Sequence, residues 1–140
     1  MHAGFTGTQK GLTPPQRDAL EVELLRFSVL HHGDCIGADA QAHRIAKGLG
    51  IWTVSHPPTD DRKRAFCDAD EERAPLPHLE RNRQIVDEGE VLISCPRLEE
   101  KRQPRSGTWE IYWVRPNQLA AVVIKTMRAI ANRHIEGAGK

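Results

Sequence analysis

Short apolar runs alternate with amphipathic stretches along this chain. The runs have the length of buried strands and end at glycine, proline or polar residues; they cover residues 3–6, 29–31, 51–55, 91–94 and 120–124. The stretches between them space their apolar residues as helices do. Strands that alternate with helices form parallel sheets with right-handed crossovers. The pattern predicts a single α/β domain over residues 1–140, a Rossmann-like open parallel sheet of about five strands with helices on both faces.

The first predicted helix carries a start signal. Thr13 suits the N-cap, Pro14 the first helical position, and Gln16 the reciprocal position of a capping box. Leu20, Leu24 and Phe27 then lie on one face. Further helices are expected at 38–47, at 79–88, near Trp109 and at 126–134, and a loop with a short helix near 62–67 is expected within 59–77.

Composition narrows the class of protein. The net charge of +1 among 140 residues gives no general attraction for DNA or an anionic membrane, so nucleic acid is not the expected partner. No apolar run reaches the ~20 residues that span a bilayer, and the first residues do not resemble a signal peptide. Three cysteines without CxxC spacing favour neither disulfides nor structural zinc. We therefore expect a soluble, cytoplasmic protein.

The carboxyl ends of parallel strands meet at one edge of a sheet, which is where such folds bind ligands. The residues near that edge are rich in glycine, hydroxyl and charged side chains. The candidate ligand-binding residues are Thr6, Gly7, Thr8, Gly33, Asp34, Gly37, Asp39, Pro57, Arg81, Asn82, Arg105, Ser106, Gly107, Thr108 and Trp109.

Each group has an ordinary structural alternative. The loop 4–8 either cradles an anion or is a simple turn. Asp39 either binds a ribose hydroxyl or stabilises a helix dipole, and Arg81 either meets an anionic ligand or is solvated. Trp109 either stacks on a ring beside a phosphate held by Arg105 or belongs to the core. No Walker A loop or complete GxGxxG motif is present.

Four possible ligands raise the question of a metal: His31, His32, Asp34 and Cys35. Strand alternation sends His31 and His32 to opposite faces, so these two cannot both bind one ion without distortion. No metal and no cofactor are expected.

Several motifs in order resemble the SLOG superfamily of DprA-like, lonely-guy-like and YpsA-like proteins, and in particular its small, often phage-associated members. The similar elements are Gly4-Phe-Thr-Gly-Thr8, His32-Gly-Asp-Cys-Ile-Gly-Ala-Asp39, His56-Pro57-Pro58, Arg81-Asn82-Arg83 and Arg105-Ser-Gly-Thr-Trp109. The resemblance implies a Rossmann-like domain that binds a nucleotide or a nucleotide-derived ligand. It also implies a homo-oligomer, and we expect a dimer.

Lonely-guy-like enzymes hydrolyse the N-glycosidic bond of nucleoside monophosphates, and here the resemblance is incomplete. Their signature Gly-Gly-x-Gly-Thr-x-x-Glu, aligned on Gly107-Thr108, places Pro104 and Arg105 at the first two glycines and Ile111 at the glutamate. Glu110 lies one residue early, about 100° around a helix. A hydrolase would need a carboxylate near the sugar, for which Asp39 and then Glu110 are the candidates. The open alternatives are ligand binding alone, hydrolysis, DprA-like binding of single-stranded nucleic acid, and carriage of a phosphate-bearing cofactor.

Overall fold

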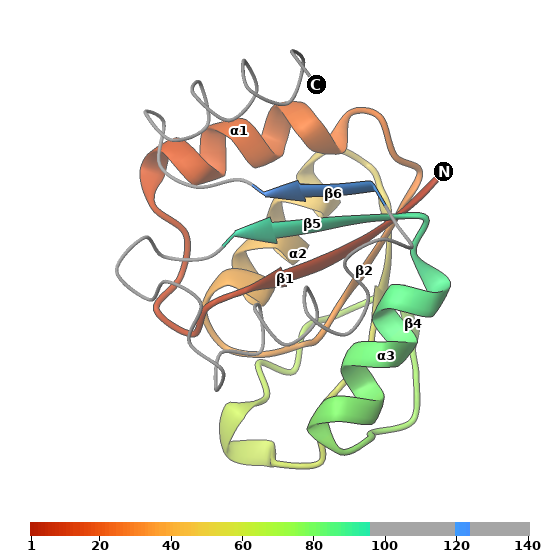
Figure 1. The fold of residues 1–140 in the computed structure, drawn as a ribbon. Helices are drawn as coiled ribbons and strands as arrows, with labels where there is room; N and C mark the ends of the chain where they lie inside the picture. The colour runs from red at the N-terminus through yellow and green to blue at the C-terminus, as the bar shows by residue number, and fades with distance from the viewer. Residues whose placement is uncertain (96–119, 124–140) are drawn as a thin grey trace.

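The computed structural model describes residues 1–95 and the backbone of 120–123. Strands and helices alternate as the sequence predicts (Figure 1). In chain order the elements are β1 (His2–Gly7), α1 (Pro14–Leu24), β2 (Val29–His32), α2 (Ala38–Gly48), β3 (Trp52–Ser55), the 3₁₀ turn η1 (Asp61–Lys63), β4 (Glu71–Glu72), α3 (His78–Glu88), β5 (Val91–Cys95) and β6 (Ala120–Val123).

All strand pairs are parallel, in the order β4-β3-β2-β1-β5-β6. The Rossmann-like α/β sheet and its five predicted strands are confirmed. The prediction missed β4, because two exposed glutamates carry no apolar pattern. The short helix expected near 62–67 is instead the three-residue turn η1. The helices expected near Trp109 and at 126–134 lie outside the described residues.

The side chains of β1 alternate between two helix layers. A methyl group on Gly4 would meet Ile85 of α3, whereas one on Gly7 would meet Ala38 of α2. The helices α1 and α2 therefore cover one face of the sheet and α3 covers the other, as predicted (Figure 1). The larger apolar cluster lies on the α1 and α2 face and includes Phe5, Leu20, Leu24, Leu30, Ala42, Ala46 and Ile93. Val86 and Leu92 pack on the other face.

The capping box that starts α1 is confirmed. Gln16 N donates to Thr13 Oγ1 over 3.2 Å, and Thr13 N donates to Gln16 Oε1 over 3.0 Å. These bonds satisfy amides that a helix start leaves without partners. Among residues 1–95 and 120–123, the helices are too short or too polar for membrane crossing.

Ile93 on β5 is fully buried in the larger apolar cluster, on the α1 and α2 face of the sheet. Replacing it with alanine removes buried methyl groups and leaves a cavity, so Ile93→Ala should lower the free energy of unfolding by about 2–5 kcal/mol. Urea denaturation measures this change. Leu25→Ala is the matched control because Leu25 is 68% exposed, and a comparable loss in both variants would contradict the assignment of the core.

Candidate ligand-binding site

The strand order reverses direction at β1, which makes the carboxyl end of β1 a topological switch point. From β1 the chain passes through α1 to β2 on one side, and it returns through α3 to β5 on the other. Thr6 pairs with Ser94 and Gly7 with Cys95, so the ends of β1 and β5 lie in register. A switch point of this kind is the usual ligand site of open α/β sheets.

Three buried polar atoms near the carboxyl ends of β1 and β5 lack hydrogen-bond partners within the described part of the chain. They are Thr8 Oγ1 after β1, Ser94 Oγ on β5 and Asn82 Nδ2 in the first half of α3. An unsatisfied buried polar group costs about 1–3 kcal/mol, so a partner is expected. Thr8 and Asn82 were predicted site residues. Ser94 was missed because a strand-end serine carries no motif.

Gly37 joins two of the predicted segments. Its φ of +91° is a left-handed conformation, and a methyl group there would lie 2.4 Å from the carbonyl oxygen of Gln9. The amide of Ala38 donates to Thr8 O over 2.9 Å, so the loop after β1 rests on the start of α2. The predicted proximity of Thr6–Thr8 to Gly33–Asp39 is confirmed. Glycine is required here by contact between the two loops.

Asp34 anchors the long loop that follows β3. Its side chain is fully buried; Oδ2 accepts from Arg64 Nε over 2.8 Å and Oδ1 accepts from the amide of Cys67 over 2.8 Å. The amide of Ala65 also donates to Asp34 O. Pro57 belongs to the same loop, where its carbonyl oxygen accepts from Leu76 N over 3.2 Å. Both predicted residues shape the loop through bonds to the protein itself.

Asp39 lies in the first turn of α2 and faces the glycine-rich segment. Its Oδ2 accepts from the amide of Cys35 over 3.2 Å, and the amide of Gly33 also bonds to it. Burial raises the pKa of this carboxyl to about 6, although the positive charge of Arg81 opposes the shift. A carboxyl that titrates near neutrality can accept or donate a proton, and it also orients the loop amides.

Arg81 braces α3 against the glycine-rich segment. Nη1 donates to Gly33 O over 2.7 Å and to Cys35 Sγ over 3.3 Å, and Nε donates to Asn82 Oδ1 over 3.0 Å. A methyl group on Gly33 would lie 2.5 Å from Nη1, so this approach depends on glycine. Asn82 Oδ1 accepts the bond from Arg81 Nε, whereas its amide nitrogen Nδ2 is buried without a hydrogen-bond partner among the described residues.

A cavity of about 410 Å³ opens beside Gly37. It is lined by Lys10, Gly11, Ile36, Gly37, Ala40, Gln41, Arg44, Arg64 and Ala65. Three of these residues are basic and none is acidic, which suits an anionic ligand of ordinary size. The sequence analysis missed Lys10, Arg44 and Arg64. The spacing of residues 37, 40, 41 and 44 places them on one face of a helix, and this spacing could have predicted that Arg44 lies on the same side of α2 as Gly37.

The remaining predicted residues fall outside the described part of the chain. They are Arg105, Ser106, Gly107, Thr108, Trp109 and the catalytic candidate Glu110.

The histidines behave as strand alternation predicts. His32 Nε2 lies 3.2 Å from His43 Nδ1 on the α2 face, and His31 Nδ1 lies 3.0 Å from His56 Nε2 on the α3 face. Burial lowers the pKa of His31 to about 4 and that of His32 to about 3. Both rings are therefore neutral near pH 7. Among the described residues, two groups have spacings that suit a metal ion: His32, His43 and Cys67, and His31, His56 and Glu88.

Comparison with solved structures identifies proteins of the same fold. The molybdenum cofactor binding protein of the phototrophic bacterium Rippkaea orientalis is 18% identical, with a TM-score of 0.67 over 99% of this chain and 84% of that one. TM1055 is 14% identical, with a TM-score of 0.54 over 97% and 98%. DNA processing protein A of Streptococcus pneumoniae is 12% identical, with a TM-score of 0.52 over 94% of this chain and 60% of that one.

These solved structures share the fold of this chain over almost its whole length, so the Rossmann-like fold implied by the sequence motifs is confirmed. At such identities the likeness establishes the fold alone. No protein-family description matches the chain, and no curated protein matches it.

The anchoring role of Asp34 predicts a local effect. Asp34→Ala removes the acceptor of Cys67 N, and a hydrogen bond to a charged group contributes about 1.5–3 kcal/mol. Hydrogen exchange at the amide of Cys67 should therefore accelerate by about 10- to 100-fold. Asp18→Ala, on the exposed side of α1, is the control. Unchanged protection of Cys67 in Asp34→Ala would show that the loop is held by other contacts.

The raised pKa of Asp39 predicts how stability depends on pH. Between about pH 4 and pH 6 the folded state holds a proton on Asp39 that the unfolded state releases, so the contribution of this group to stability falls as pH rises. The loss should be of order 2 kcal/mol, at ~1.4 kcal/mol per pH unit. Asp39→Asn should flatten this part of the stability profile in urea titrations. Parallel profiles for wild type and variant would rule out the shift.

Proposed function

We propose that this protein binds a nucleotide or a nucleotide-derived ligand at the carboxyl edge of its sheet. The observation that carries the proposal is the cavity lined by basic residues, placed beside a loop that holds the Thr8 hydroxyl, which is buried and has no hydrogen-bond partner among the described residues. The amide of Ala38 bonds to Thr8 O, which holds this loop against the start of α2, next to the lining residue Gly37. We infer that one ligand extends from the cavity to this loop.

The two features suit different parts of such a ligand. A phosphate is matched by Lys10 and Arg44 in the cavity, where a dense negative charge meets two positive ones. Arg64 lines the same cavity but is paired with Asp34 and Glu72. Sugar or base oxygens are matched by Asn82 Nδ2, a donor without a protein partner among the described residues. The Rippkaea orientalis neighbour is a molybdenum cofactor binding protein, which supports a small molecule as the ligand class.

Calorimetric titration with a panel of nucleoside phosphates and NAD-derived nucleotides tests the proposal. At least one compound should bind below millimolar concentration, and its nucleoside without phosphate should bind about tenfold or more weakly, because each lost charged contact costs more than about 1.4 kcal/mol. Affinity should fall as salt is added. The absence of any binding below millimolar concentration would contradict the proposal.

Arg44→Ala localises the phosphate contact. Arg44 lines the cavity, whereas Arg17 on α1 is an exposed arginine that does not. The first substitution should weaken the nucleotide about tenfold, and Arg17→Ala should leave its affinity unchanged. Equal effects would show that only general positive charge is involved.

A second function is favoured by one observation, the near-neutral pKa of Asp39 at the carboxyl edge of the sheet. Hydrolysis of an N-glycosidic bond builds positive charge on the sugar, and a carboxyl of this kind can activate water or stabilise that charge. Incubation with nucleoside monophosphates should then release free base, detectable by chromatography. Asp39→Asn should bind the same nucleotide and release no base. Equal release by both proteins would remove Asp39 from the reaction.

A further inference from the structure

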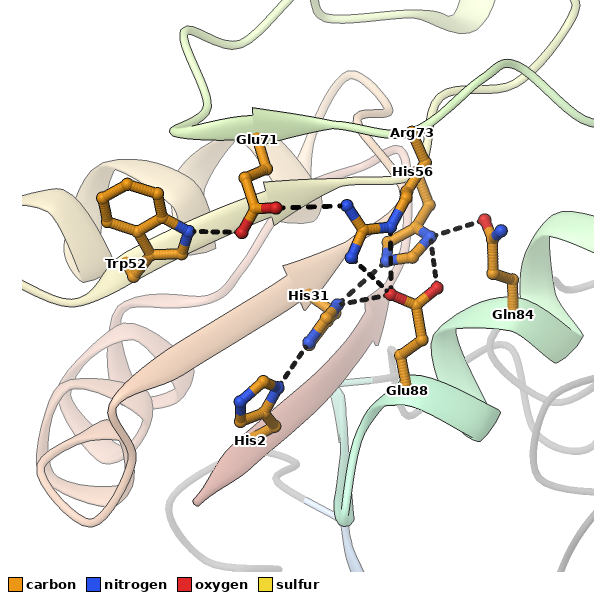
Figure 2. Close-up of polar contacts among 8 residues, drawn as sticks. All are labelled: His2, His31, Trp52, His56, Glu71, Arg73, Gln84 and Glu88. Atoms are coloured by element: carbon orange, nitrogen blue, oxygen red, sulfur yellow. Dashed lines mark hydrogen bonds and ion pairs between the residues drawn. The ribbon is translucent and has the colours of Figure 1, made fainter.

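Three side chains from distant parts of the chain meet beneath α3. His31 belongs to β2, His56 follows β3 directly, and Glu88 is the last residue of α3. Figure 2 shows the two rings and the carboxylate pointing toward one another. His31 and His56 are almost completely buried, and the side chain of Glu88 is 27% exposed. The group therefore has a closed interior and one side that solvent reaches.

The spacing of the three groups suits a transition-metal ion. His31 Nδ1 lies 3.0 Å from His56 Nε2 and 3.8 Å from Glu88 Oε1, and all three donor atoms fall within 4.8 Å of one another. A tetrahedral zinc ion with bonds of about 2.0–2.1 Å separates its ligand atoms by about 3.3 Å. The separations of His31 Nδ1 from His56 Nε2 and from Glu88 Oε1 each lie within about half an ångström of that value.

The outer ring nitrogens are already positioned as metal sites require. His56 Nδ1 donates to Gln84 Oε1 over 2.7 Å, which leaves Nε2 unprotonated toward the centre. His31 Nε2 lies 2.9 Å from His2 Nδ1. If the proton of His31 moves to Nε2 and is donated to His2, its Nδ1 also offers a lone pair. Histidine ligands normally have such outer partners.

The group His32, His43 and Cys67 does not present two unprotonated ring nitrogens in this way. His32 Nδ1 accepts from the amide of Asp34 over 3.0 Å, so the proton of the neutral ring is on Nε2 and points at His43 Nδ1. Ligation through Nε2 would leave His32 without a ring proton. Burial also raises the pKa of Cys67 to about 12, which disfavours the thiolate that binds metal. His32 and His43 therefore form an ordinary hydrogen-bonded pair.

We propose that His31 Nδ1, His56 Nε2 and the Glu88 carboxylate bind one divalent transition-metal ion of the zinc type, with a fourth position open to water. Two imidazoles and one carboxylate are ligands that zinc accepts, and three protein ligands leave one position free. The site is separate from the proposed nucleotide site and does not depend on it.

Arg73 competes with a metal ion for the carboxylate of Glu88. Its Nε and Nη2 donate to Glu88 Oε1 over 3.0 and 2.8 Å, which neutralises the carboxylate when no ion is bound. An ion would therefore have to displace Arg73 from Glu88 Oε1, or bind Oε2 of the same carboxylate, which lies 4.0 Å from His56 Nδ1. The guanidinium also opposes a second positive charge nearby. Removal of Arg73 should therefore strengthen metal binding.

Zinc titration of the full-length, metal-stripped protein against a chromophoric chelator tests the site, with cobalt as a spectroscopic substitute. The protein should bind one equivalent of zinc, and cobalt should give the visible absorption of a four-coordinate ion. Glu88→Gln should weaken zinc binding at least tenfold, and Gln84→Leu should weaken it about 10- to 100-fold, the usual loss for an outer partner. Arg73→Met should strengthen it, and the control His43→Gln should leave it unchanged.

The outcomes separate the alternatives. The proposal is overturned if the wild-type protein binds no stoichiometric zinc, if His43→Gln abolishes binding, or if Glu88→Gln does not weaken it. Thermal unfolding followed by circular dichroism identifies variants that fail to fold. Tighter binding by Arg73→Met cannot arise from loss of structure, so this variant decides the question even if Glu88→Gln proves unstable.

Discussion

The parallel pairing of β1 on both sides is the constraint on which the rest of the structure depends. A strand held by β2 and β5 must point successive side chains to opposite faces, and its neighbours follow in register. One face carries the apolar core beneath α1 and α2. The other lies beneath α3 and holds His31. The same pairing places the carboxyl ends of β1 and β5 together at the switch point of the sheet.

The fold was predictable because its signals are local. Apolar runs of strand length, the Thr13 capping box and the alternation of strands with helices each depend on residues within one or two turns. The convergence of Thr6–Thr8 with Gly33–Asp39 followed from topology alone. β4 was not predictable, because its pairing with β3 depends on the path of the long loop and not on an apolar pattern.

The roles of individual site residues were harder to predict because their partners are remote in sequence. Asp34 bonds to Arg64 and Cys67, about thirty residues away, and Arg81 bonds to Gly33 across a still longer separation. These contacts hold the wall of the site. His31 and His32 belong to different groups of possible metal ligands, as strand alternation predicts for neighbouring residues. The partners of His31 could not be predicted, because His56 and Glu88 come from other elements of the chain.

The central claim is that the basic cavity and the switch point of the sheet form one ligand site, and nuclear magnetic resonance of the ¹⁵N-labelled protein tests it most directly. During titration with the tightest-binding nucleoside phosphate, the side-chain amide of Asn82 and the backbone amides of Lys10 and Gly37 should shift together and saturate at one ligand per chain. Saturable shifts confined to other parts of the protein, with these three signals unmoved, would contradict the account.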